Sequence, residues 1–364
     1  MKIIILIGGG RSGIDLLQSL FDQHSQVSQF PGVFNWSEFY NLVKNEKSFE
    51  KIAKIFIKQY DVFFNSKKNK RERHDKLGIK KNLFYEVSEK KFVNYFKNKS
   101  KGSKTNKKNI LNNLHLAYSF ASGESIRKKK FIIINLHSLD YIKDIDEFNY
   151  KILYTIRDPL VSLSSGFKHW LDYKNGSMAS PWSIYFHIER QFNALKKLSY
   201  KRQKTHVIKL EELHQNSKKT LKKLCKFTGL KYKSSLLTST YHNKKWWGDS
   251  LSKKYLNGLN KNFKNKIYFN IFYKKDIFLL KKYLEEIYKK YKYENNFIEK
   301  EFSISLLTKF IPLKIELILF YKQMRNLKLL GLISSFYYYF KRVNLMKKRS
   351  PKILMWLKMS ISST

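Results

Sequence analysis

Cysteine and long apolar runs are almost absent from this chain of 364 residues. The single cysteine, Cys225, excludes an intrachain disulfide and suits a reducing compartment. No segment reaches the roughly 18 uninterrupted apolar residues of a membrane-spanning helix. The apolar run at residues 3–7 ends at three glycines and is too short for the core of a signal peptide. These absences predict a cytoplasmic protein, either free or held peripherally at a membrane.

Acidic residues are also scarce. There are 28 Asp and Glu against 73 Lys and Arg, which gives a formal net charge of +45. Only ten of the basic residues are Arg, the side chain better suited to bidentate phosphate contacts. The lysines are spread along the whole chain, so we interpret most of them as a solvated surface and do not expect nucleic acid as the partner. An anionic membrane or a polyanionic glycan stays open as the partner of this charge.

The first glycine-rich segment lies between a predicted strand and a predicted helix. Residues 3–7 are apolar and mostly β-branched, as in a buried parallel strand, and residues 14–21 carry apolar side chains at helical spacing. Between them stands GGGRSG, from Gly8 to Gly13. Backbone N–H groups at such a turn hold anions. This order predicts an α/β nucleotide-binding fold.

The same loop argues against two common nucleotide sites. As a Walker loop it lacks the Lys and Ser/Thr that would contact phosphate and Mg²⁺, because Ile14 and Asp15 stand there. A Rossmann site requires a second strand that ends in an Asp or Glu, which binds the ribose. Residues 24–32 contain Pro31 and show no apolar strand that ends in an acid, and Glu38 comes six residues later. A nucleotide-dependent kinase or a Rossmann oxidoreductase therefore stays only as an alternative.

A second anion motif follows a predicted strand at residues 151–156. Arg157, Asp158 and Pro159 come directly after it, and Pro suits the first turn of a helix. Ser165 lies eight residues after Arg157, two helical turns further on. A guanidinium at the strand end and a hydroxyl on the helix could meet one anion.

Together the two motifs resemble those of the sulfotransferase superfamily. Its phosphosulfate loop runs Pro-(Arg/Lys)-Ser-Gly-Thr-Thr, which Arg11, Ser12 and Gly13 match, while Gly10 replaces the Pro and Ile14 and Asp15 replace the threonines. Its 3′-phosphate motif is a strand, Arg-(Asp/Asn)-Pro, and a Ser eight residues after the Arg. The resemblance implies a P-loop-like α/β fold and 3′-phosphoadenosine 5′-phosphosulfate (PAPS) as the donor. It implies donor binding by Gly10, Arg11, Ser12, Gly13, Arg157 and Ser165.

Later segments extend the resemblance, which covers about residues 2–45 and 130–250. Residues 206–213 resemble a family strand, and residues 242–248 resemble a basic segment that covers the nucleotide, so Lys244 or Lys245 is expected at the 3′-phosphate. The family places a catalytic His after the strand that matches residues 131–134, which makes His137 the candidate base. Arg11 is expected to neutralise the leaving phosphate oxygen.

Two carboxylates are the alternatives to His137 as the base. Other branches of the superfamily use a Glu, so we keep Glu38 and Glu86 as the fallback candidates. No spacing typical of metal ligands stands out, and no metal is expected.

The overall expectation is a mostly parallel sheet flanked by helices with a C-terminal helical extension. Residues 1–300 are predicted as the α/β domain, with helices and a lid at about 45–130, and residues 301–364 as the extension. Within the extension Pro312 is expected to kink a helix. The segment is Leu-, Ile- and Tyr-rich with Lys at intervals, so core-packed helices and an interfacial membrane segment both stay open.

The predicted function is transfer of a sulfuryl group from PAPS to a hydroxyl or amine acceptor, which the sequence does not identify. A glycan or a lipid headgroup fits the basic surface. The replacements at Ile14 and Asp15 leave one further alternative, a catalytically degenerate scaffold that acts as a basic binding protein.

Overall fold

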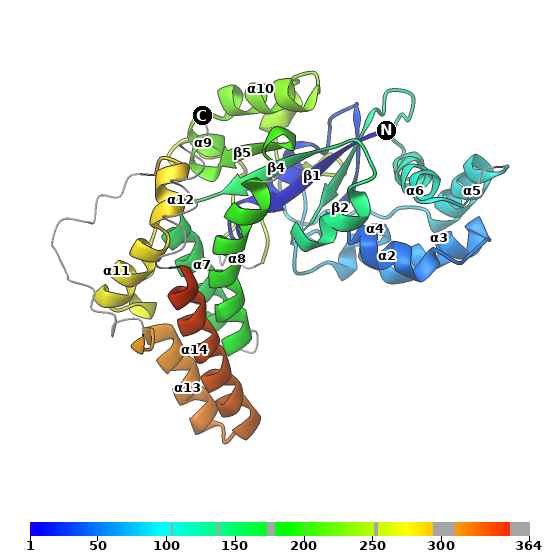
Figure 1. The fold of residues 1–364 in the computed structure, drawn as a ribbon. Helices are drawn as coiled ribbons and strands as arrows, with labels where there is room; N and C mark the ends of the chain where they lie inside the picture. Colours follow the sequence, from blue (N-terminus) through cyan, green and yellow to red (C-terminus); the bar gives the residue numbers. More distant parts are fainter. Residues whose placement is uncertain are drawn as a thin grey trace, which may run out of the picture. The chain divides into compact units, whose positions relative to one another are not determined.

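The computed structural model describes residues 1–102, 105–136, 139–172, 179–199, 201–250, 254–293 and 310–349 (Figure 1). The chain divides into two compact units. The α/β unit comprises Met1–Gly8, Ser12–Ile156 and Lys201–Lys264. The helical unit comprises Gly9–Arg11, Arg157–Tyr200 and Asn265–Thr364. The predicted boundary at residue 300 lies outside the described residues.

A parallel sheet forms the centre of the α/β unit. Its described strands are β1 (Lys2–Gly8), β2 (Val27–Val33), β3 (Phe131–Asn135), β4 (Tyr150–Ile156) and β5 (Thr205–Lys209), in the order β2-β3-β1-β4-β5. Every pairing is parallel, and the side chains of β1 after Lys2 are all buried. The runs of apolar residues that predicted β1, β3, β4 and β5 are thus confirmed as parallel strands, which are almost wholly buried in β1, β3 and β4 and mostly half-buried in β5.

One strand of this sheet was not predicted from the sequence. Residues Val27–Val33 form β2 at an edge of the sheet and pair with β3 alone. Pro31 is tolerated because an edge strand has one side without a partner strand. The register shifts between Gln29 and Val33, around the proline. No acid ends the strand, since Phe34 and Asn35 follow it.

Helices pack at both ends of this sheet. One group contacts or follows β2 and the other contacts β5, and their places are visible in Figure 1. The first group holds α2 (Trp36–Val43), α3 (Phe49–Gln59), α4 (Asp61–Phe64), α5 (Glu89–Ser100) and α6 (Lys107–Ala121). The second holds α9 (Leu210–Gln215) and α10 (Ser217–Thr228). Helix α1 (Ile14–Leu20) follows the glycine loop, and a two-stranded ribbon joins β6 (Thr240–Tyr241) to β7 (Lys244–Lys245).

Helix α10 shows how the sequence determines an element. It ends where Gly229 adopts φ 85°, a left-handed conformation that glycine takes without strain. Leu221, Leu224 and Cys225 are buried in the same apolar cluster as Ile4 and Leu6 of β1. The predicted C-cap is confirmed, and the lone cysteine is a buried core residue. Burial raises the pKa of the Cys225 thiol to about 11, so it stays protonated at neutral pH.

The helical unit is built around α7 (Pro159–Asp172) and α8 (Pro181–Ser199). They are joined by α11 (Lys274–Tyr283), α12 (Glu285–Lys290), α13 (Lys314–Arg325) and α14 (Leu329–Arg349). One apolar cluster links them through side chains such as Phe167, Ile188, Leu280 and Leu319. The mostly helical pattern predicted beyond residue 265 is confirmed for the described residues.

The expected kink at Pro312 is wrong. Pro312 lies before α13, two residues from its first residue Lys314. Proline lacks the N–H that a helix interior needs, so here it stands outside the helix and does not bend it. The break between α13 and α14 comes at residues 326–328 instead. No helix in the described part of the chain is long and apolar enough to cross a membrane.

Candidate active site

The glycine-rich loop connects β1 to α1 and contains three left-handed residues. The φ angles of Gly10, Arg11 and Gly13 are 85°, 45° and 81°. Gly13 is the N-cap of α1, and it brings no side chain to accept the helix's first N–H groups. When left-handed residues alternate with other conformations, successive backbone N–H groups point to the same side and can bind an anion. The predicted strand–loop–helix is therefore confirmed in its backbone form.

In the α/β unit, two hydroxyl groups fix the second half of this loop. The Ser12 Oγ lies 2.9 Å from the Thr155 Oγ1 near the end of β4, and both residues are 1% exposed. Gly8 pairs in register with Thr155. A Cβ on Gly8 would stand 2.5 Å from Ser12 Oγ and 2.6 Å from Thr155 Oγ1. Glycine is thus required at this position by close approach of the two hydroxyls.

In the helical unit, side chains from α7 and α8 bind the carbonyl groups of the first half of the loop. The Ser162 hydroxyl donates to the Gly10 carbonyl at 2.6 Å, and the Gln191 amide donates to the Gly9 carbonyl at 2.8 Å. Gln191 also donates to Ser162 at 3.1 Å. The loop carbonyls are therefore bound by protein groups, and its conformation is organised before any ligand arrives.

His187 of α8 packs against the same part of the loop. A Cβ on Gly10 would stand 3.2 Å from both Cε1 and Nδ1 of this imidazole. The ring is 6% exposed, and its Nε2 has no hydrogen-bond partner within the described part of the chain. Burial, with help from Arg190 and Arg11, lowers the pKa of His187 to about 3. A neutral imidazole thus lies against the loop, and no sequence pattern indicated it.

Arg157 and Ser165 lie where the second motif predicts them in the fold. Arg157 follows β4 directly, and its Nε donates to Asn265 Oδ1 at 3.1 Å. Pro159 is the first residue of α7, and the Asp158 carboxylate accepts from the Val161 N–H at 2.9 Å, which caps the helix. Ser165 is half-buried on α7. The predicted strand before Arg157 and the helix that begins at Pro159 are confirmed, and the binding roles of Arg157 and Ser165 stay predictions.

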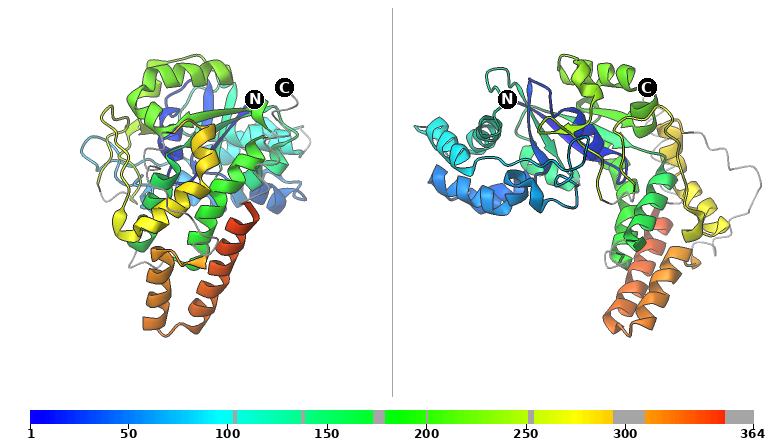
Figure 2. Two further views of the ribbon diagram at one scale, coloured as in Figure 1. Left: turned by 60° about the vertical axis from the view of Figure 1, so that its left-hand side comes forward. Right: turned by 180° about the vertical axis from the view of Figure 1, so that it is seen from behind.

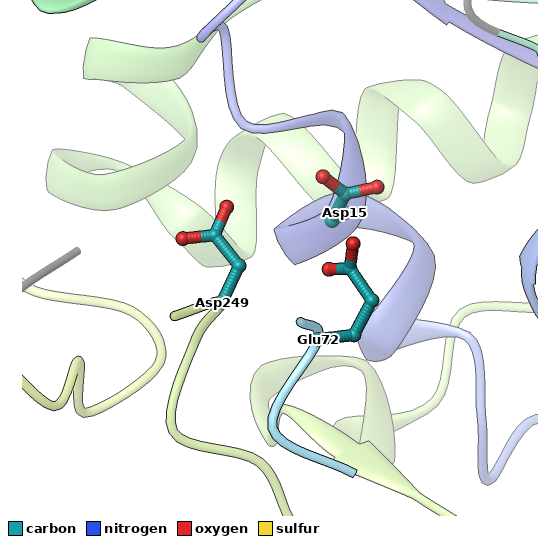
Figure 3. Close-up of side chains that lie close together, drawn as sticks. All are labelled: Asp15, Glu72 and Asp249. Carbon is teal, nitrogen blue, oxygen red and sulfur yellow. The ribbon is translucent and has the colours of Figure 1, made fainter. Parts of the chain in front are cut away.

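Asp15, which replaces a threonine of the family loop, belongs to a group of three carboxylates. Carboxylate oxygens of Asp15, Glu72 and Asp249 lie within 4.8 Å of one another (Figure 3). Asn135 Nδ2 donates to Asp15 Oδ1 at 3.1 Å. Carboxylates of this kind are ligands that hard cations prefer, and they oppose a nearby anion. Ile14, the other replaced position, is 8% exposed and packs in the core cluster.

The two predicted lysines, Lys244 and Lys245, form strand β7. Lys244 lines a polar cavity of about 510 Å³ together with Asp22, which comes just after α1, and with Glu86. The Lys245 ammonium lies 4.0 Å from the centre of the Trp247 ring. The structure thus places Lys244 by the end of α1 that is remote from the glycine loop.

None of the three candidate bases is described next to the glycine loop. His137 lies outside the described residues. Glu38 is exposed near the start of α2, where it accepts from the Asn35 amide at 2.9 Å. Glu86 is exposed beside Lys67 at 3.8 Å and lines the cavity with Asp22. Neither glutamate is brought to Ser12 or Asp15 by any described contact.

The solved structures that are similar to this chain include sulfotransferases and sulfotransferase domains. No curated protein sequence matches the chain. The sulfotransferase domain from the curacin biosynthetic pathway is 15% identical, with 80% of this chain and 98% of that chain covered and a TM-score of 0.42. The sulfotransferase domain of the Synechococcus PCC 7002 olefin synthase is 14% identical, with 70% of this chain and 80% of that chain covered and a TM-score of 0.37. Sulfotransferase STF9 from Mycobacterium avium is 9% identical, with 64% of this chain and 65% of that chain covered and a TM-score of 0.33.

The family model described as the sulfotransferase family matches residues 4–234, more than half of the chain. The chain therefore belongs to the sulfotransferase family. The matched residues run from β1 to the segment after α10 and contain both anion motifs.

Proposed function

We propose that this protein transfers a sulfuryl group from PAPS to a hydroxyl or amine acceptor. The observation that carries the proposal is the pairing of β1 with β4. Gly8 at the start of the glycine loop is in register with Thr155, two residues before Arg157. The two family motifs therefore begin at neighbouring strand ends, where open parallel sheets bind ligands.

In this proposal the loop binds the phosphosulfate and Arg157 binds the 3′-phosphate. The N–H groups of Ser12 and Gly13 and the guanidinium of Arg11 would face the bridge between phosphorus and sulfur. Ser165 would add a hydroxyl to the 3′-phosphate contact. Lys244 and Lys245 keep their proposed place there only if the segment around them moves, because Lys244 lies beside Asp22.

The reaction requires one proton to move and one bond to exchange. The acceptor oxygen or nitrogen forms a bond to sulfur while the bond from sulfur to the bridging phosphate oxygen breaks. The leaving oxygen keeps the electron pair on adenosine 3′,5′-bisphosphate, where positive charge from Arg11 would stabilise it. A base takes the acceptor proton, and His137 is our proposed base.

Asp15 is the residue of the loop region least compatible with an anionic donor. Its carboxylate lies with those of Glu72 and Asp249, next to the first turn of the helix that the family uses for the phosphosulfate. Negative charge there opposes an anionic donor. This observation favours a second candidate function, a catalytically degenerate sulfotransferase scaffold that acts as a basic binding protein.

A transfer assay separates the two functions. The protein is incubated with PAPS labelled in the sulfuryl group and with pools of glycans, lipids and small hydroxyl or amine compounds. Label in an acceptor, with one adenosine 3′,5′-bisphosphate released for each transfer, supports the enzyme. Absence of both donor binding and transfer to any pool, under conditions where a known sulfotransferase is active, supports the degenerate scaffold.

A further inference from the structure

The far end of the α13–α14 hairpin exposes large apolar side chains to solvent. Leu327 in the turn is 92% exposed, and Leu330 at the start of α14 is 82% exposed. Further exposed residues of the hairpin are Leu317, Tyr321, Met324, Leu329, Ile333, Phe336, Tyr337 and Phe340. Exposed apolar side chains gathered on one part of a folded protein indicate a surface that contacts a partner or a membrane.

These side chains fall on one stripe of each helix. On α13, Leu317, Tyr321 and Met324 are spaced by four and three residues. On α14, the exposed side chains recur at residues 329, 333, 336, 337 and 340. This is the spacing of an apolar helix face that is covered by something. Within the described residues nothing covers it.

The turn between the helices makes the exposure more unusual. Leu327 has φ 50°, a left-handed conformation that side chains with a Cβ adopt at a cost. A turn that faces water would be expected to carry Asn or Gly there. Here the chain places a leucine at a left-handed position where its side chain is 92% exposed. Folding of the monomer in water gains nothing from this choice.

The base of the hairpin is firmly attached to the helical unit. Ile315, Leu319 and Met346 are at most 1% exposed and belong to its apolar cluster. The buried Arg342 guanidinium donates to both carboxylate oxygens of Glu316, at 2.6 and 2.9 Å. Figures 1 and 2 show α13 and α14 side by side, with the turn beyond the ends of α7 and α8. The base of the hairpin is therefore fixed in the helical unit, and its far end is apolar and exposed.

Basic residues lie near the apolar end. Lys322 and Arg325 are in the last turns of α13, and Lys328 directly precedes α14. The single acid of residues 310–349, Glu316, lies at the base of the hairpin and is paired with Arg342. Arg325 and Lys328 are exposed on either side of Leu327. Apolar and aromatic side chains with cations beside them are typical of segments that lie in the interface of an anionic bilayer.

We propose that the end of the α13–α14 hairpin inserts into the headgroup region of an anionic phospholipid membrane. The occupant is a lipid surface rather than a second copy of the chain, because self-association through this end would bring two sets of cations together. The proposal goes beyond sulfuryl transfer and does not depend on it.

Sedimentation with lipid vesicles tests the proposal on the full chain. Wild-type protein should pellet with vesicles of phosphatidylcholine and phosphatidylserine and much less with phosphatidylcholine alone. The double variant Leu327→Asn, Leu330→Gln should lower the partition coefficient at least about tenfold, since two apolar side chains leave the lipid. Asn suits a left-handed turn, so folding is retained. Arg325→Gln with Lys328→Gln should lower it on the order of tenfold for the anionic vesicles alone.

The matched control is Ile79→Gln. Ile79 is 82% exposed but lies in the α/β unit, so its replacement should leave vesicle binding unchanged. Absence of wild-type binding to anionic vesicles at low salt would overturn the proposal. So would equal binding of the leucine double variant, or an equal loss with Ile79→Gln.

Two further measurements distinguish other occupants of the apolar end. If light scattering after gel filtration shows a dimer that the leucine double variant dissociates, and vesicles do not bind, the occupant is a second copy and the proposal is wrong. If removal of residues 350–364 abolishes vesicle binding while the double variant retains it, the C-terminal residues are the lipid contact and the hairpin is not. Binding that survives this truncation supports the hairpin.

Discussion

The Ser12 hydroxyl lies 2.9 Å from the Thr155 hydroxyl, and the pair is buried between the glycine loop and the end of β4. Leaving one buried hydroxyl without its partner costs about 1–3 kcal/mol, whereas removing both is far less costly. Thr155→Val should therefore lower the free energy of unfolding by about that amount, and adding Ser12→Ala should recover part of it. Urea unfolding of the two single variants and the double variant measures this coupling. Additive losses would show that the contact contributes nothing.

Asp15 should weaken donor binding because its carboxylate lies beside the anion loop. Asp15→Asn removes the charge with little change of shape, and Asp15→Thr also restores the hydroxyl of the family pattern. Loss of one unit of negative charge near a phosphate is expected to raise affinity for adenosine 3′,5′-bisphosphate about tenfold. Calorimetry on the two variants separates the effect of charge from that of the hydroxyl. Weaker binding by both would mean that the carboxylate helps to hold the nucleotide.

The proposed base gives a kinetic prediction. His137→Ala should reduce turnover by about 10²–10⁴-fold, the usual effect of losing a positioned proton acceptor. Affinity for adenosine 3′,5′-bisphosphate should stay near that of the wild type, because the base contacts the acceptor. An active enzyme whose turnover is unchanged in this variant would refute the assignment. Glu38→Gln and Glu86→Gln would then be tested in the same assay.

Buried histidines predict a loss of stability in acid. Burial lowers the pKa of His115 to about 3, and neither ring nitrogen has a hydrogen-bond partner in the described residues. The unfolded chain takes up a proton near pH 6.5 and the folded chain does not, so stability is full above that pH and falls as the pH drops toward 3. At pH 5 this one group costs about 2 kcal/mol.

His115→Phe should remove that share of the acid sensitivity. The ring lies against Phe30 with centroids 4.0 Å apart and the planes tilted by 31°, so an aromatic replacement keeps the packing. Thermal unfolding at pH 7 and pH 5 measures the difference. If the variant loses as much stability between these pH values as the wild type does, His115 is not a source of the acid sensitivity. His74, His187 and His242 should then account for the remainder, because burial lowers their pKa values to about 3 as well.

The sequence could predict the parts of the fold that depend on local pattern. Four of the described parallel strands, the start of α7 at Pro159 and the end of α10 at Gly229 follow from apolar runs and from the conformations of Pro and Gly. Strand β2 was missed because its strand character depends on an edge position that only the assembled sheet provides. The same reason explains Pro312, whose place outside α13 depends on where the chain turns.

The site could be predicted only where its residues are consecutive. Arg11, Ser12 and Gly13 form a motif, and so do Arg157 and Ser165. His187 contacts Gly10 across 177 positions of sequence by way of the fold, and Glu72 and Asp249 reach Asp15 in the same way. No spacing rule connects residues that are brought together by tertiary packing. The exposed end of the hairpin was likewise invisible, because amphipathic spacing does not show which face is covered.

The central claim is that Arg157 and the glycine loop bind the two phosphate groups of the donor without a metal. Titration calorimetry with adenosine 3′,5′-bisphosphate in the presence of a chelator tests it most directly, on the wild type, on Arg157→Ala and on Arg202→Ala, an exposed arginine of the α/β unit, as the control. A charge-assisted contact to phosphate contributes about 1.5–3 kcal/mol, so Arg157→Ala should bind at least about tenfold more weakly while Arg202→Ala binds like the wild type. Equal affinity of the wild type and Arg157→Ala, or binding that requires Mg²⁺, would contradict the account.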